Sequence, residues 1–140
     1  MLLRLFNKNK IYQSAGITVK QSQVHERGVF ACKKIKAGEV IERAPVILLQ
    51  AGDKEFLQNT SLFSYYFLID NADAPAALGL GNSSLYNHSY TANAVYTVCL
   101  KDTCLIIKAC KPIKPGEEIT LNYNGKPNDA TPVYFQPETI

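Results

Sequence analysis

The stretch Leu85-Tyr86-Asn87-His88-Ser89-Tyr90-Thr91-Ala92-Asn93-Ala94-Val95-Tyr96 brings amide, imidazole, hydroxyl and phenol groups together. In a core strand these donors and acceptors would all need partners after leaving water, which is costly. The stretch flanks no evident surface linker and leads directly into an apolar segment. We therefore interpret it as a functional site and not as a solvated loop.

Composition is that of one globular domain. The chain has 140 residues, of which 46% are hydrophobic and 19% charged, enough for one sizeable core and far from a disordered composition. The net charge of +3 is small, and no stripe of Lys and Arg is interleaved with aromatic residues. We expect no direct nucleic-acid partner.

The cysteines indicate a reducing environment. Residues 1–10 contain too short an apolar run for a signal peptide, and residues 46–49 are too few to span a bilayer. We therefore expect a soluble intracellular protein with free thiols and no membrane association. No pair has the Cys-x-x-Cys spacing, so no metal site is expected. The cysteines are Cys32, Cys99, Cys104 and Cys110.

Alternating apolar and polar residues predict strands at 17–20 and 119–123. A hairpin is predicted from residues 95–100 and 104–109, joined by a tight turn. Pro45 should interrupt a strand that resumes at residues 46–49. Many short strands without βαβ alternation indicate a mainly β domain and exclude a Rossmann-type fold.

One helix is expected over residues 53–70. Asp53 can cap its start, and apolar residues recur at roughly helical spacing, with a possible break at residues 59–61.

Three separated motifs resemble the SET domain, the fold of most protein-lysine methyltransferases, over roughly residues 17–135. Arg27-Gly28-Val29-Phe30 is similar to the second half of the family's Gly-x-Gly segment, which approaches S-adenosylmethionine. Asn87-His88-Ser89 followed by Asn93 is similar to its Asn-His-Ser-x-x-x-Asn motif. Gly116-Glu117-Glu118-Ile119-Thr120 leading to Tyr123 resembles the final motif, whose tyrosine faces the methyl group in transit.

The resemblance implies a mainly β SET-domain (β-clip) fold of several small sheets, with a short helical insert and a knot-like C-terminal threading. It implies a single domain over residues 1–140, with a core of about 17–125 and a docking tail at 126–140. No cysteine-rich flank is present, so the chain resembles the compact stand-alone members without zinc clusters. Glu26 replaces the usual first glycine, and Ala92 replaces the usual proline before Asn93.

The resemblance also implies the site residues. Tyr123 would be catalytic, and Tyr96 and Tyr66 would line the channel for the substrate lysine. The cofactor S-adenosylmethionine would be held by Arg27, Gly28, Val29, Phe30, Tyr66, Asn87, His88 and Phe135. Either the Tyr134-Phe135 tail or a second copy of the chain, forming a homodimer, would complete the substrate wall.

The implied activity is an S-adenosylmethionine-dependent protein-lysine N-methyltransferase that acts on a histone or another protein. This methyl transfer needs no metal, but the amine must arrive deprotonated although free lysine titrates near pH 10.4. A narrow apolar channel lowers that pKa. A tyrosine that titrates near pH 10 is a poor base at pH 7, so Tyr123 is expected to orient the reactants.

Two alternatives remain from the sequence. One is a non-catalytic SET-like module that binds a peptide or the cofactor, which Glu26 in the cofactor turn would favour. The other is a thiol hydrolase pairing a cysteine with His25 or His88, although no cysteine has an evidently activating environment.

Overall fold

The computed structural model describes residues 12–13, 15–70 and 74–133. The predicted tail residues Tyr134 and Phe135 lie outside the described residues. Among those described, no helix has the length and hydropathy needed to cross a membrane.

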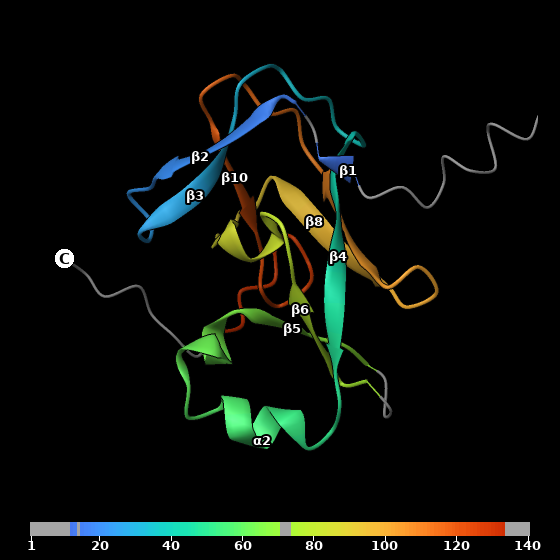
Figure 1. Ribbon diagram of the computed structural model, residues 1–140. Coiled ribbons are helices and arrows are strands. Elements are labelled where there is room, and N and C mark those ends of the chain that lie inside the picture. The colour runs from blue at the N-terminus through green and yellow to red at the C-terminus, as the bar shows by residue number, and fades with distance from the viewer. Residues whose placement is uncertain (1–11, 14, 71–73, 134–140) are drawn as a thin grey trace, which may run out of the picture.

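The described chain is mainly β, as predicted (Figure 1). Its strands are β1 Tyr12–Gln13, β2 Ile17–Gln21, β3 Arg27–Ala31, β4 Val40–Leu49, β5 Tyr66–Leu68, β6 Ala76–Gly79, β7 Asn87–His88, β8 Ala94–Cys99, β9 Cys104–Ala109 and β10 Glu118–Leu121. Within the described residues, one short helix, α2 Asp53–Leu57, and two 3-10 turns, η1 Ser61–Ser64 and η2 Ser83–Leu85, complete the regular structure.

The strands follow the order β2-β3-β10-β8-β9-β4-β6-β5, with β1 on β4 and β7 on β10. Figure 1 shows the β2–β3 hairpin at one end of the molecule, and α2 with β5 at the other. β10 meets β8 only at Leu121 and Ala94. Such short ladders divide the array into small sheets, as expected for the SET-domain fold.

Strand β10 lies between two parts of the chain that are distant in sequence. It pairs antiparallel with β3 and parallel with β7 and β8. Its side chains Ile119 and Leu121 are fully buried. The C-terminal strand is therefore inserted between the N-terminal hairpin and the stretch that follows η2, and it helps to form the core of both.

The core consists of aliphatic side chains from the central strands and the loops between them. Its members include Val29, Ile35, Ile41, Leu105, Ile107, Ile113, Ile119 and Leu121, each at most 1% exposed. Burial of each such side chain contributes about 1.5–3 kcal/mol before entropy is counted.

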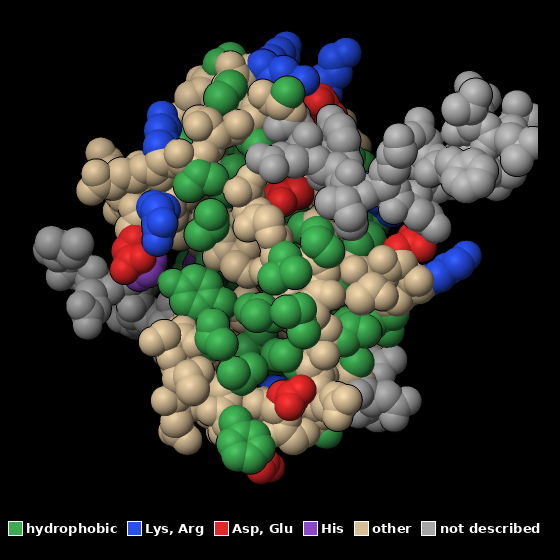
Figure 2. Space-filling model, in the orientation of Figure 1, with side chains coloured by type: hydrophobic (Ala, Val, Ile, Leu, Met, Phe, Trp, Pro, Cys, Tyr) green, Lys and Arg blue, Asp and Glu red, His purple; other side chains and the backbone are tan. Residues whose placement is uncertain are grey.

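Large hydrophobic side chains also reach the surface. Figure 2 shows them gathered on the face over the lower part of the molecule, where Figure 1 places β5, β6 and the end of β4. Ile47, Leu68 and Leu80 from this region are 49%, 63% and 40% exposed.

The predicted strands at 17–20, 95–100, 104–109 and 119–123 are confirmed as β2, β8, β9 and β10 to within two residues at their ends. The strand expected to break at Pro45 instead continues as β4 through that residue. Proline has no backbone N–H to donate, but its carbonyl can still accept a hydrogen bond. The Pro45 carbonyl accepts from the Leu80 amide at 3.0 Å, so the strand continues through this residue.

The helix predicted to start at residue 53 and its possible break at residues 59–61 are confirmed, but its continuation to residue 70 is wrong. The Thr60 hydroxyl accepts from the Leu62 amide and donates to the Leu57 carbonyl, so one helix ends and a 3-10 turn begins there. Residues 66–68 form β5, which pairs with β6. Asp53 does not cap α2 either; Gly52 precedes the helix, and the Asp53 carboxylate accepts from the Gln50 amide.

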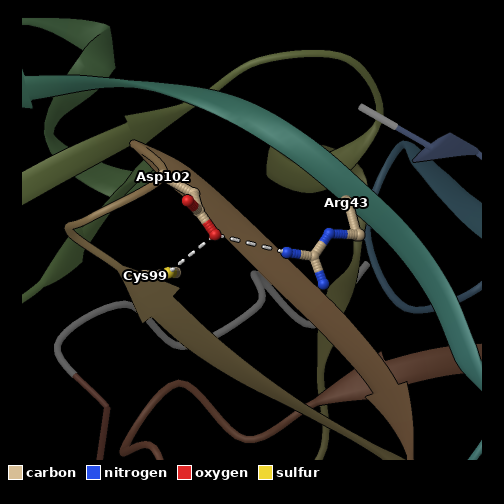
Figure 3. A network of polar contacts seen from close by, with 3 residues as sticks. All are labelled: Arg43, Cys99 and Asp102. Atoms are coloured by element: carbon tan, nitrogen blue, oxygen red, sulfur yellow. Dashed lines mark hydrogen bonds and ion pairs between the residues drawn. The ribbon is translucent and has the colours of Figure 1, made fainter. Parts of the chain in front are cut away.

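The β8–β9 hairpin is anchored to β4 through its turn (Figure 3). The guanidinium of Arg43 lies 3.7 Å from the Asp102 carboxylate, which also accepts from the Cys99 thiol at 3.5 Å. Cys99, Asp102 and Cys104 offer side-chain atoms within 4.8 Å of one another. Because Arg43 already supplies the cation beside Asp102, we attribute this group to hairpin anchoring.

Candidate functional site

The three motifs found in the sequence meet along β10. Glu118 and Ile119 pair with Phe30 and Val29 of β3. On the other edge, Thr120 and Leu121 pair with Asn87 and His88 of β7. The insertion of β10 therefore places the first and second motifs on opposite sides of the third.

Asn87 ties the second motif to the first. Its buried side-chain amide donates to the carbonyls of Arg27 at 3.0 Å and His25 at 3.2 Å, and to the Glu118 carboxylate at 2.7 Å. Since these contacts use the side-chain N–H groups, the Asn87 side chain fixes the β2–β3 turn. Any ligand contact made by Asn87 would therefore involve its side-chain oxygen or its backbone.

Gly28 is required by the protein's own packing. A Cβ at this position would overlap the Glu118 carboxylate and lie 3.0 Å from Asn87 Nδ2. The Ser22 hydroxyl also binds Glu118, at 2.9 Å. The absence of a side chain at Gly28 lets this polar cluster close against the backbone.

Asn93 fastens β10 at its centre. Its side chain accepts from the Thr120 amide at 2.9 Å and donates to the Glu118 carbonyl at 2.8 Å. Both groups lie in β10, so the last residue of the second motif fixes the strand that carries the third.

His88 anchors the segment that leads to Tyr123. Its Nδ1 accepts from the Tyr123 amide at 3.1 Å, so in the neutral ring the proton is on Nε2. Burial lowers the pKa of His88. Among the described residues its buried Nε2 has no hydrogen-bond partner, so its N–H group is an unsatisfied donor.

A cavity of about 750 Å³ lies beside this junction. Tyr66, Tyr96 and Tyr123, the predicted channel and catalytic residues, all line it. They come from β5, β8 and the segment after β10. The rest of its wall includes Phe63, Tyr65, Phe67, Leu68, Ser83, Ser84, Tyr86, Asn124, Thr131, Pro132 and Val133.

Hydrogen bonds hold the phenols in place. The Tyr123 hydroxyl donates to the Tyr86 carbonyl at 2.7 Å. The Tyr96 hydroxyl donates to the Tyr123 carbonyl at 3.3 Å, and its ring packs edge-on against Phe67 at 4.8 Å. Burial raises the pKa of both Tyr96 and Tyr123, so both phenols are protonated at neutral pH.

The described part of the tail forms one wall of this cavity. Asn124 donates from its side chain to the Thr131 carbonyl at 2.6 Å, and the Val133 amide donates to the Tyr90 hydroxyl at 3.3 Å. Residues 131–133 contribute to the cavity lining. Phe135, predicted to stack on adenine, lies outside the described residues.

The first motif contributes mainly backbone. Val29 is fully buried in the core, whereas Arg27 is exposed. The ring of Phe30 lies 4.4 Å beneath the Lys20 ammonium group. The Val29 side chain therefore packs in the core, and only its backbone is available to a ligand.

The SET domain family model matches residues 26–124. The chain belongs to the SET domain family. Human histone-lysine N-methyltransferase 2B is 30% identical over 94% of the chain. The Schizosaccharomyces pombe histone-lysine N-methyltransferase specific for H3 lysine-37 is 28% identical over 76% of the chain and 72% of its own length. Histone-lysine N-methyltransferase trithorax of Drosophila virilis is 32% identical over 76% of the chain.

This SET domain spans 5% of the human relative and 3% of the fly relative. A solved structure from Plasmodium falciparum, a protein proposed to be a histone methyltransferase, matches its fold with a TM-score of 0.65 and 26% identity. That match covers 79% of this chain and 94% of the Plasmodium chain.

Sequence reasoning missed Glu42 and gave Tyr86, which lies in the site stretch 85–96, no role of its own in this SET domain. Both are buried, at 2% and 1% exposed, and their side chains are joined by a 2.8 Å hydrogen bond. An acid within the apolar strand β4 was the available signal. Its inward orientation depends on a register shift between Val40 and Glu42, which local alternation does not reveal.

Proposed function

We propose that this SET domain is an S-adenosylmethionine-dependent protein-lysine N-methyltransferase. The observation that carries the proposal is the convergence of Tyr66, Tyr96 and Tyr123 on one cavity. The relatives named as histone-lysine N-methyltransferases support the same activity.

The residues proposed to hold the cofactor surround the junction of β3, β7 and β10. They are Arg27, Gly28, Val29, Phe30, Asn87 and His88, with Tyr66 and Phe135 contributing aromatic surface. The buried, unpaired Nε2 of His88 fits this assignment, because a ligand would supply the partner that the described residues lack. When bound, S-adenosylmethionine supplies a methyl group on a positively charged sulfur.

The chain's own residues would prepare the lysine amine. Seven of the 18 residues that line the cavity are aromatic, and burial against their rings disfavours an ammonium ion and lowers the pKa of an entering lysine. Tyr123 keeps its proton, and its hydroxyl is held at a defined position by the hydrogen bond that it donates to the Tyr86 carbonyl. We assign Tyr123 the task of orienting the amine, because alignment of the reacting atoms lowers the barrier to such a displacement.

The cavity mouth suits a protein substrate. Phe63, Tyr65 and Leu68 line the cavity and are 39%, 36% and 63% exposed. Aromatic and aliphatic side chains at a rim can pack against a peptide that inserts its lysine. A histone tail is the substrate that the relatives suggest, and an intracellular location follows from such a substrate. A second copy of the chain or the tail would complete the wall.

Neither alternative gains support from the described residues. Glu26 has a φ of 33°, so it retains the left-handed backbone that glycine adopts most easily. Its presence therefore does not argue for a non-catalytic module. Burial raises the pKa of the Cys104 thiol, which is the opposite of what a thiol hydrolase needs.

The proposal is tested by tritiated methyl transfer from S-adenosylmethionine to a set of lysine-containing peptides, histone tails included. The expected result is label on one or a few peptides, which is lost when the target lysine is replaced by arginine. A folded protein that binds the cofactor but labels no peptide and no protein from a cell extract would contradict the proposal.

A further inference from the structure

Tyr86 connects a buried polar cluster with the cavity. Its phenol donates to Glu42 Oε2 at 2.8 Å, and its backbone carbonyl accepts the 2.7 Å hydrogen bond from the Tyr123 hydroxyl. The side chain is 1% exposed. One residue therefore touches β4 at one end and the proposed catalytic phenol at the other.

Glu42 is held at both carboxylate oxygens. Oε2 accepts from Tyr86, and Oε1 accepts from the Asn82 amide at 3.0 Å. Gly81, with a φ of 65°, closes over the carboxylate, and a Cβ there would lie 2.9 Å from Oε1. The loop before η2 is thus wrapped around Glu42 in a conformation that favours glycine.

Burying Glu42 with Tyr86 costs more free energy of folding than burying a hydrophobic pair would. Glu42 is 2% exposed, and burial raises the pKa of its carboxyl group. Among the described residues it has no ion pair within 4 Å. A leucine facing a phenylalanine would avoid the cost of desolvating a carboxylate. What the polar pair adds is a directional contact that fixes the Tyr86 ring.

The register shift in β4 explains how Glu42 reaches this position. Val40 pairs with Lys108, but Glu42 pairs with the adjacent Ile107, so β4 has one extra residue there. Such a bulge turns the following side chain to the other face of the strand. Glu42 therefore points inward, toward η2 and Tyr86.

We propose that Glu42 is a positioning residue, which acts through Tyr86 to fix the carbonyl that holds the Tyr123 hydroxyl. Glu42 itself does not line the cavity, whereas Tyr86 and Tyr123 do. Its functional consequence rests on the proposed methyl transfer: releasing the Tyr86 carbonyl should disturb the alignment of the amine, on which the rate and the number of methyl groups depend.

The contact can be measured without any activity. The sequence contains two Tyr-Asn pairs, Tyr86-Asn87 and Tyr123-Asn124. Protein labelled with carbonyl-¹³C tyrosine and ¹⁵N asparagine therefore gives two carbonyl–amide NMR correlations. The Tyr123→Phe variant lacks the signal of the Tyr123-Asn124 pair, so the signal that remains is assigned to Tyr86-Asn87. This remaining signal should also shift upfield, because the Tyr86 carbonyl has lost its hydrogen-bond donor.

Glu42→Gln and Glu42→Asp test the proposal, and Glu39→Gln is the matched control. Glu39 lies just before β4 and binds the Lys36 amide, away from Tyr86. We expect both Glu42 variants to move the Tyr86 carbonyl signal toward its position in Tyr123→Phe. Folded Glu42 variants with the signal at its wild-type position would overturn the proposal.

The functional readout is the ratio of mono-, di- and trimethylated peptide, together with kcat at saturating cofactor and peptide. We expect kcat to fall about tenfold or more in the Glu42 variants, with an altered product ratio and an unchanged cofactor Kd. A wild type without methyl transfer would contradict the proposed function, while the carbonyl signal would still decide the role of Glu42.

Discussion

The amide of Tyr123 donates to Nδ1 of His88 at 3.1 Å across 35 residues of sequence. This bond requires an unprotonated Nδ1, so it ties the backbone of the proposed catalytic tyrosine to the charge state of an imidazole. Protonation of His88 would turn the acceptor into a donor facing the donor amide.

His88 should make stability fall in acid. Burial lowers its pKa below the ordinary value of 6.5. The stability it contributes is therefore present above about pH 6.5 and is lost as the pH falls through the lower folded-state pKa. Melting temperatures between pH 7 and 5 should fall more for the wild type than for His88→Asn, whose Oδ1 still accepts a hydrogen bond. If the melting temperatures of the wild type and of His88→Asn fall equally between pH 7 and 5, this role is refuted. His25→Asn, at an exposed site, is the control.

Tyr96→Phe should raise the number of methyl groups transferred. The change removes a hydroxyl from the cavity but keeps the ring against Phe67. The lost 3.3 Å hydrogen bond should cost about 1 kcal/mol of stability. Mass spectrometry should show more di- and trimethylated peptide. Thr97→Val, at an exposed position of the same strand and outside the cavity lining, should keep the wild-type ratio. An unchanged ratio in Tyr96→Phe would be evidence against the assignment.

Gly28→Ala should destabilise the protein by about 1–3 kcal/mol, because the added methyl group displaces the Glu118 carboxylate. Urea unfolding measures this directly. Gly52→Ala is the control, since no atom lies within 4 Å of its added Cβ. Glu118→Ala should recover part of the loss in a double variant. Equal stability of Gly28→Ala and wild type would contradict the packing described.

Thr103→Gly should stabilise the β8–β9 turn. Thr103 has a φ of 49°, which costs a branched residue about 1–2 kcal/mol, partly offset by the entropy of glycine. The net gain should be about 0.5–1 kcal/mol in urea unfolding. Thr97→Gly, at an exposed position inside β8, should instead lose stability. Destabilisation by both changes would show that the turn is not strained.

Alternation of apolar and polar residues predicted those strands and turns that depend on neighbouring residues in the sequence. The β8–β9 hairpin follows from alternation on both sides of a short turn. The final motif identified Tyr123, the family resemblance added Tyr66 and Tyr96, and the structure places these three phenols in one cavity. That juxtaposition could be expected only through the family resemblance, because no periodicity connects β5, β8 and the end of β10.

The remaining features depend on distant contacts. Residues 66–68 have helical spacing but pair with β6, and the Thr60 hydroxyl ends the preceding helix. Glu42 and Tyr86 meet across 44 residues because of a bulge in β4. Neither the bulge nor its partner strand can be read from the residues around it.

The Tyr123→Phe variant tests whether Tyr123 orients a lysine amine for methyl transfer. Titration calorimetry with S-adenosylmethionine and methyl transfer to the best peptide are measured on the same preparations of wild type and variant. We expect the cofactor Kd to stay within about twofold, while transfer falls on the order of a hundredfold or more. Equal transfer by variant and wild type, or no cofactor binding by folded wild type, would contradict the account.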